Sequence, residues 1–185
     1  MAKFLMRHGE SLANELHVAG GDPPLTETGE RQAREAWLPD GISSVRSSHL
    51  LRATQTSRIV GRRLGIVPGR ELPEFDEVFF GAYDGMPVDD WFDEMYDKDI
   101  EALCAEVGGN DVVARVRLAV EVLDGVPDGT LVVTSDTLLR CMEGWLAEGR
   151  IVPLGELPLI ANCEVLSYED GRLVRIGPET RGSEA

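Results

Sequence analysis

A short apolar run near the start of the chain, Phe4-Leu5-Met6, ends directly in Arg7-His8-Gly9. The run predicts a buried first strand over residues 2–6, and α/β sheets bind ligands just beyond the carboxyl ends of their strands. The planar fork of arginine matches phosphate oxygens, and a neutral histidine keeps a nitrogen lone pair that can attack phosphorus. Gly9 lets the backbone approach a ligand closely. These residues therefore predict a phosphate pocket with a nucleophile.

Strand-like and helix-like stretches alternate along the rest of the chain, which favours an α/β fold built in layers. The clearest buried strand is Thr130–Thr134, and Glu169-Asp170-Gly171 is typical of a hairpin turn. A further strand is expected over 42–47, and helices are expected over 26–38, 50–64 and 137–147. Thr26 is the expected N-cap of the first of these helices. The alternation therefore predicts a sheet with helices packed against it.

We expect a single domain over residues 1–177, because 185 residues are enough to bury one core and no linker divides them. A cap insertion is expected at about 86–110, where Trp91, Phe92 and Tyr96 suggest a helix with an aromatic face. These aromatic side chains are expected to pack in the core more often than to contact substrate. Residues 178–185 are expected to form a disordered tail.

Charge and composition exclude several classes of function. A net charge of -15 argues against nucleic-acid and anionic-membrane partners. No apolar run approaches the roughly 20 residues that span a bilayer, and the N-terminus has no secretory pattern. The three cysteines are widely spaced, with neither a zinc spacing nor a disulfide framework, which favours a reduced, cytoplasmic location. The sequence favours no particular oligomeric state.

Acidic residues are concentrated in one stretch of the chain. Glu71 to Glu106 contains 13 acidic residues and a single basic residue, Lys98. This stretch is interpreted as a solvated surface, and the alternative is an acidic lid above the phosphate pocket. Such a lid would repel substrates that carry several negative charges.

Polar groups follow three of the expected strands directly. Arg7 and His8 follow the first strand, Arg52 lies just beyond the second, and Ser135-Asp136 follows the buried strand 130–134. Because parallel strands end at one edge of a sheet, we expect these groups to meet in an anion site.

The residues at these strand ends resemble those of the histidine phosphatase superfamily, which includes the cofactor-dependent phosphoglycerate mutases. The resemblance is carried by Arg7-His8-Gly9-Glu10-Ser11 with Asn14, Pro24-Leu25-Thr26, Gly29 with Gln32-Ala33, Ser47-Ser48, Leu51-Arg52-Ala53, Gln55-Thr56, Glu77 ahead of Gly81, Asp84 and Gly85, and Asn162 with Val165. It implies a three-layer sandwich, whose mixed and mostly parallel sheet lies between helices.

The resemblance also implies roles for single residues. His8 would attack the phosphoryl group and form a phosphohistidine, while Arg7, Asn14 and Arg52 would hold the phosphoryl oxygens. Glu77, with nearby Glu74 as the alternative, would protonate the departing alcohol and then activate water. No metal or other cofactor is implied, because the arginines supply the positive charge. The remaining histidines, His17 and His49, match no motif and are expected to be surface or packing residues.

The pattern departs from the family at Asp136. After the strand the family places Ser-His-Gly, whereas this chain has Ser135-Asp136-Thr137. An ionised aspartate only accepts hydrogen bonds and would repel phosphate. Exchanging an attractive for a repulsive charge at about 4 Å, with an effective dielectric of about 20, changes the interaction by several kcal/mol.

Three arrangements of Asp136 are compatible with the sequence. It could pair with Arg52 or Arg7, or pair with Arg140 one helical turn later and point away from the site. It could also be protonated beside Glu77 as a coupled acid pair.

Three functional hypotheses follow from these arrangements. The first is a phosphomonoesterase of the histidine acid phosphatase type, acting on a small phosphate ester or other anionic substrate through phospho-His8; mutase activity is less favoured. The second is a repurposed member that binds an anionic ligand or a protein partner. The third is metal-free acid–base chemistry with Glu77 and Asp136.

Overall fold

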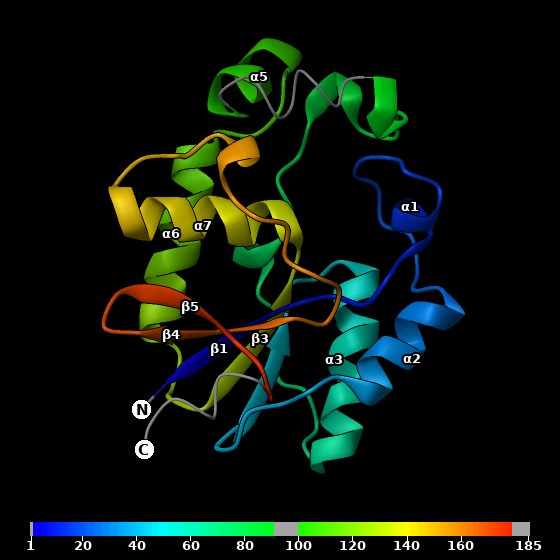
Figure 1. Cartoon of the computed structure of the whole chain (residues 1–185), viewed down its shortest axis with the longest axis vertical. Helices are drawn as coiled ribbons and strands as arrows, with labels where there is room; N and C mark the ends of the chain where they lie inside the picture. The colour runs from blue at the N-terminus through cyan, green and yellow to red at the C-terminus, as the bar shows by residue number, and fades with distance from the viewer. Residues whose placement is uncertain (1, 91–99, 179–185) are drawn as a thin grey trace.

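The computed structural model describes residues 2–90 and 100–178, and these contain one five-stranded sheet in the order β2-β3-β1-β4-β5 (Figure 1). The strands are β1 (Lys3–Arg7), β2 (Ser44–Ser47), β3 (Thr130–Thr134), β4 (Val165–Glu169) and β5 (Arg172–Ile176). β2, β3 and β1 are parallel, whereas β4 pairs antiparallel with β1 and β5 pairs antiparallel with β4. The sheet is therefore mixed, as expected, and its parallel part supplies one common carboxyl edge.

Helices cover both faces of this sheet, which makes the fold a three-layer sandwich (Figure 1). The helices are α1 (Leu12–Glu15), α2 (Glu27–Glu35), α3 (Leu51–Leu64), α5 (Ile100–Val107), α6 (Val112–Gly125) and α7 (Asp136–Glu148). Short 3-10 turns lie at η1 (Pro73–Phe75), η2 (Gly81–Tyr83), η3 (Val88–Asp90) and η4 (Leu154–Glu156). None of the helices within the described residues is long and apolar enough to cross a membrane.

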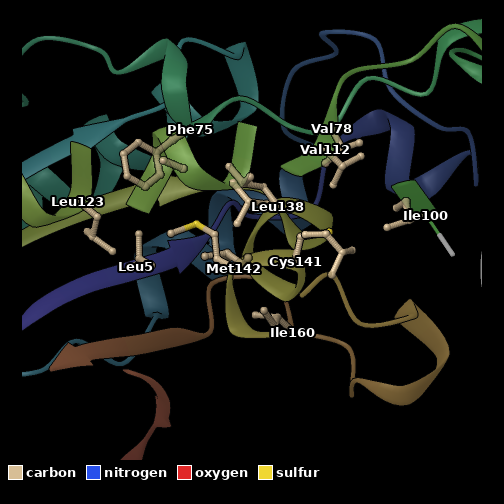
Figure 2. Packing of buried hydrophobic residues seen from close by; sticks show 14 of the residues in the cluster. Leu5, Phe75, Val78, Ile100, Val112, Leu123, Leu138, Cys141, Met142 and Ile160 are labelled. Atoms are coloured by element: carbon tan, nitrogen blue, oxygen red, sulfur yellow. The ribbon is translucent and has the colours of Figure 1, made fainter. Parts of the chain in front are cut away.

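The alternation of side chains along β1 divides the core in two. Leu5 packs with Phe75 and with Leu138 and Met142 of α7 on one face of the sheet (Figure 2). Phe4 and Met6 point the other way, into a cluster with residues of α2 and α3. Because successive strand residues face opposite sides, this one strand is buried on both faces and its end is held rigidly between the layers.

Local signals in the sequence set most of the element boundaries. The Thr26 hydroxyl accepts a hydrogen bond from Gly29 N at 3.0 Å, which confirms Thr26 as the N-cap of α2. The helix ends at Glu35, earlier than the expected 38, because Ala36 leaves the helical conformation with a ψ of 136°. Pro39 disfavours a helical conformation only at Leu38, so it does not account for this earlier end.

In the described part of the chain, two α-helices lie between η1 and β3. One of them is not expected from the sequence, and the other lies in the expected cap. Helix α6 is not among the expected elements, although Val112, Val116, Ala119 and Leu123 form a buried stripe at helical spacing. Its many valines are typical of strands, and burial against the sheet overrides that preference. In the expected cap, α5 ends before Gly108, whose φ of 74° suits glycine. The aromatic residues Trp91, Phe92 and Tyr96, and the tail from residue 179, lie outside the described residues.

Candidate active site

The carboxyl ends of the three parallel strands meet beside one cavity. His8 N donates to Thr134 O at 2.9 Å and Ser48 N donates to Val133 O at 2.8 Å, so the pairing continues just past each strand. A cavity of about 350 Å³ opens at this edge. The residues that the sequence singles out all line it, namely Arg7, His8, Asn14, Arg52, Glu77 and Asp136. The topology therefore brings together the whole set of candidate site residues.

His8 is buried at the floor of this cavity, with 3% of its surface exposed. Its Nδ1 lies 2.6 Å from Gly9 O, and Arg52 Nε lies 3.0 Å from its Nε2. Because a carbonyl oxygen only accepts, Nδ1 carries the proton and Nε2 keeps the lone pair. Burial, together with the positive charges of Arg52 and Arg7, lowers the pKa of His8 well below its ordinary value, although the bond to Gly9 O opposes this. The imidazole is therefore neutral near pH 7, with Nε2 as a nucleophilic atom.

The turn that carries His8 is fixed by backbone packing. Gly9 N donates to Thr56 Oγ1 at 3.1 Å, and Asn162 Nδ2 donates to His8 O at 3.0 Å. A Cβ added at Gly9 would lie 2.4 Å from Gly29 O. The close approach of α2 thus requires a glycine at position 9.

Two arginines converge on the same floor from different elements. Arg52, in the first turn of α3, is 4% exposed and also donates from Nη1 to Gly21 O at 2.9 Å. Arg7, at the end of β1, donates from Nη1 to Ile160 O, while its buried Nε has no hydrogen-bond partner among the described residues. Asn14 lies beside them in the chain's first helix, where its Oδ1 accepts from Ser11 N at 3.1 Å. These groups can present several N–H donors to one anion.

Glu77 reaches the cavity from the segment after η1 and binds the start of α7. Its Oε1 accepts from Val78 N at 2.9 Å and from Leu138 N at 3.0 Å, and Oε2 accepts from Thr137 N at 3.3 Å. Burial raises the pKa of Glu77, and the negative charge of Asp136 adds to this, whereas Arg52 and the backbone N–H bonds oppose it. The carboxyl group therefore retains a proton to higher pH than an exposed glutamate. Glu74, the alternative acid, is not part of the cavity lining.

Asp136 lines the cavity and is held by contacts with three other residues. Its Oδ1 accepts from Ile160 N at 3.0 Å and lies 3.9 Å from Arg7 Nη1, and its Oδ2 lies 3.5 Å from Arg140 Nη1. Of the three arrangements that the sequence allows, the structure combines the pairing with Arg7 and the pairing with Arg140. Arg140 is 1% exposed and donates from Nη2 to Leu154 O and Leu157 O. This arrangement offsets part of the charge of Asp136 and ties the segment 154–160 to the floor.

Two residues at the site have roles that the sequence does not reveal. Arg140 is expected from the sequence only as a partner of Asp136, yet it also fixes the backbone around η4. His17 is exposed, as expected, but it lines the same cavity as His8. No local pattern marks His17, because its place depends on contacts with residues about seventy positions later. Within the described residues, 2–90 and 100–178, no group of three or more His, Cys, Asp or Glu is arranged to hold a metal ion.

The family model of the histidine phosphatase superfamily (branch 1) matches residues 4–174. A probable phosphoglycerate mutase from Photorhabdus laumondii is 30% identical over 156 residues, which cover 76% of this chain and 72% of the relative. The crystal structure of phosphoglycerate mutase from Thermus thermophilus is 29% identical with a TM-score of 0.68, covering 96% of this chain and 99% of that one.

A mycobacterial glucosyl-3-phosphoglycerate phosphatase solved with VO3 has the same fold, with a TM-score of 0.73 at 19% identity, covering 95% of this chain and 96% of that one. The match of the family model extends from β1 into β5 and so includes every strand of the sheet. With the strand order, the buried His8 and the two converging arginines, this match shows that the chain belongs to the histidine phosphatase superfamily.

Proposed function

We propose that the protein is a phosphomonoesterase that hydrolyses a small phosphate ester through a phosphohistidine at His8. The observation that carries the proposal is the state of the His8 ring, which is neutral and buried, with Nδ1 held by Gly9 O and Nε2 directed to Arg52. A histidine fixed in this tautomer is prepared for nucleophilic attack. Glu77, with its raised pKa, lines the same cavity and can supply a proton.

The proposed reaction has two steps. In the first, a bond forms between His8 Nε2 and phosphorus while the ester P–O bond breaks, and protonated Glu77 gives its proton to the departing alcohol oxygen. In the second, ionised Glu77 takes a proton from water, whose oxygen attacks phosphorus as the P–N bond breaks. His8 is then neutral again, Glu77 is protonated, and inorganic phosphate leaves. No other reactant is consumed.

Arg52 has to change partner during the first step. In the free protein its Nε donates to the lone pair of His8 Nε2 at 3.0 Å. As phosphorus approaches Nε2, this N–H has to turn to a phosphoryl oxygen, where negative charge is present. Arg7 lines the same cavity, and its guanidinium group can donate to a second oxygen. The two guanidinium groups would then hold one phosphoryl group.

Hydrolysis is favoured over transfer between two phosphorylated molecules. Among the described residues that line the cavity, Arg7 and Arg52 are the only arginines and there is no lysine. Both are needed for the phosphoryl group at His8, so a second phosphoryl group on the same substrate would meet the carboxylate of Asp136 instead. Like charges disfavour such a substrate. The charge balance therefore supports a substrate with a single phosphoryl group.

Asp136 is proposed to stand where the family has its second histidine. A carboxylate there would slow phosphoryl transfer, since it repels the incoming phosphate. The contacts with Ile160 N, Arg7 and Arg140 compensate part of the negative charge of Asp136 and orient its carboxylate toward the segment 154–160. We therefore propose that activity persists at a reduced rate.

The test is the hydrolysis of 4-nitrophenyl phosphate between pH 4 and 8 by the unmodified protein and by His8→Ala. We expect His8→Ala to lose at least about a thousandfold in kcat/KM, because the nucleophile is absent. His49→Ala is the matched control, since its ring pairs with Asp76 and does not line the cavity. Equal activity of the unmodified protein and His8→Ala would contradict the proposal. Stabilisation by vanadate without His8-dependent hydrolysis would point to a binding role.

A further inference from the structure

His17 occupies a strained backbone position beside the cavity. It follows Leu16, the C-cap of α1, and has a φ of 51°, in the left-handed region that most residues avoid. Histidine tolerates this region better than most side chains, but the conformation still costs energy and is kept only where surrounding contacts determine it. Backbone strain of this kind is concentrated at functional sites. His17 thus combines two independent features, because its backbone is strained and the residue lines the cavity.

Contacts on both sides of the residue hold this backbone in place. His17 N donates to Asn14 O at 3.2 Å, and Val88 N donates to His17 O at 2.7 Å. The next residue, Val18, forms an isolated antiparallel bridge with Pro87. The first helix and the start of η3 are therefore joined through His17, and its side chain starts from a fixed point at the rim.

The cavity has a buried floor and an open rim. His8 and Arg52 are 3% and 4% exposed, whereas Leu159 at the rim is 60% exposed and His17 is also exposed. A phosphoryl group bound at the floor places its ester oxygen toward the rim, so the alcohol part of the substrate lies among the rim residues. Within the described residues, 2–90 and 100–178, the hydrogen bonds of His17 are made by its backbone and none engages the ring. The ring is thus available to a ligand.

We propose that His17 is a specificity-determining residue that contacts the alcohol part of the substrate, an inference that rests on the proposed function. Its imidazole N–H would donate to a hydrogen-bond acceptor on the alcohol, and a carboxylate is the strongest acceptor of this kind. Phe80, Val88 and Leu159 line the same cavity and suit an apolar body. The substrate class is therefore a monophosphate ester whose alcohol has an apolar or aromatic body and one acceptor group.

Two aryl phosphates that differ only in the acceptor test this assignment. Phenyl phosphate lacks the acceptor, and 4-carboxyphenyl phosphate carries it. His17→Gly removes the side chain and tolerates a positive φ, while His17→Asn keeps a residue type suited to that conformation and shortens the donor. Either variant is informative if the other folds poorly, and thermal unfolding shows which of them is folded. Comparing each variant with the unmodified protein on each substrate cancels the difference in leaving group between the two esters.

We expect the KM for 4-carboxyphenyl phosphate to rise about tenfold in both variants, with kcat changed by less than about twofold. The KM for phenyl phosphate should change by less than about twofold, because that ester makes no such hydrogen bond. Leu16→Ala is the matched control, since Leu16 is the 66% exposed neighbour in the same turn and does not line the cavity. It should leave the ratio of the two KM values unchanged.

Equal effects on the two esters would show that His17 only supports the backbone, and no effect on either would show that it does not touch substrate. Both results overturn the inference while His8-dependent hydrolysis still stands. Hydrolysis that does not depend on His8 would overturn the proposed function itself, and this is measured first with His8→Ala. The two failures are therefore distinguished by different variants of the same protein.

Discussion

The floor and the rim of the cavity are built in different ways. The floor is held by bonds between neighbouring strand ends and by side chains that are almost fully buried, such as His8 and Arg52. The rim combines segments that are distant in sequence, including His17, Val88 and Leu159, and its side chains are more exposed. The floor therefore has the rigidity that phosphoryl transfer needs, and the rim has the freedom to differ between related proteins with different substrates.

Several substitutions test the difference between the floor and the rim. The largest effect is expected from Glu77→Gln, which removes the acid at the floor. Glu77→Gln keeps the size of the side chain but cannot donate the proton to the alcohol. We expect kcat/KM for an alkyl phosphate, which reports the first step, to fall by about 10² to 10⁴, and less for 4-nitrophenyl phosphate, whose leaving group needs little protonation. Steady-state kinetics on both esters check this. Equal losses of kcat/KM on the two esters would contradict the assignment of Glu77 as the acid.

The pH dependence of the same step follows from the raised pKa of Glu77. The first step uses the protonated carboxyl group, so kcat/KM for an alkyl phosphate should fall as pH rises through that pKa. The fall should occur at higher pH than for an exposed glutamate, whose pKa is about 4.3. In Glu77→Gln this part of the profile should be absent. A pH–rate profile that is the same in both proteins would assign the titration to another group.

An intermediate effect is expected where the floor is joined to the segment 154–160. Arg140→Met keeps the volume but leaves Asp136 without one partner and the carbonyls of Leu154 and Leu157 without their donor. Because it removes a partner of a partly buried carboxylate and of two carbonyls, we expect a loss of about 3 kcal/mol in the free energy of unfolding, measured in urea. Adding Asp136→Asn should recover part of this loss, since the unpaired charge is then removed. Additive losses in the double variant would show that the two side chains are not coupled.

The smallest effect is expected at the rim. Leu159→Ala shortens a side chain that is 60% exposed, so the free energy of unfolding should change by less than about 0.5 kcal/mol. The KM for phenyl phosphate should rise about twofold, because part of the apolar contact with the ring is lost. Enzyme kinetics and urea unfolding on the same preparation test both statements. A large loss of kcat would instead show that Leu159 supports the chemical step, as the residues of the floor do.

The parts of the fold and site that the sequence predicts are those determined by neighbouring residues. The strand that ends at Arg7, the cap at Thr26 and the hairpin around Asp170 each depend on a few adjacent positions. Helix α6 escapes prediction because its valines favour strands, and only burial against the sheet overrides that preference. Tertiary context decides the outcome there.

The orientation of Asp136 and the place of His17 also depend on residues far away in sequence. The spacing of Asp136 and Arg140 suggests their pairing, but the contacts of the carboxylate with Ile160 N and Arg7 join segments far apart in sequence. His17 is placed by Val88, which no pattern around His17 reveals. Contacts between distant segments therefore determine what the sequence leaves open.

The most direct test of the central claim is to trap the covalent intermediate. Glu77→Gln should still accept a phosphoryl group from 4-nitrophenyl phosphate but should hydrolyse the intermediate slowly, because no base activates water. Quenching the reaction in alkali preserves a P–N bond, and mass spectrometry of the peptides then locates the phosphoryl group. We expect a phosphoryl group on His8 and none in the protein that also carries His8→Ala. Phosphorylation of another residue, or turnover of unmodified protein with no phosphohistidine formed, would contradict the central claim.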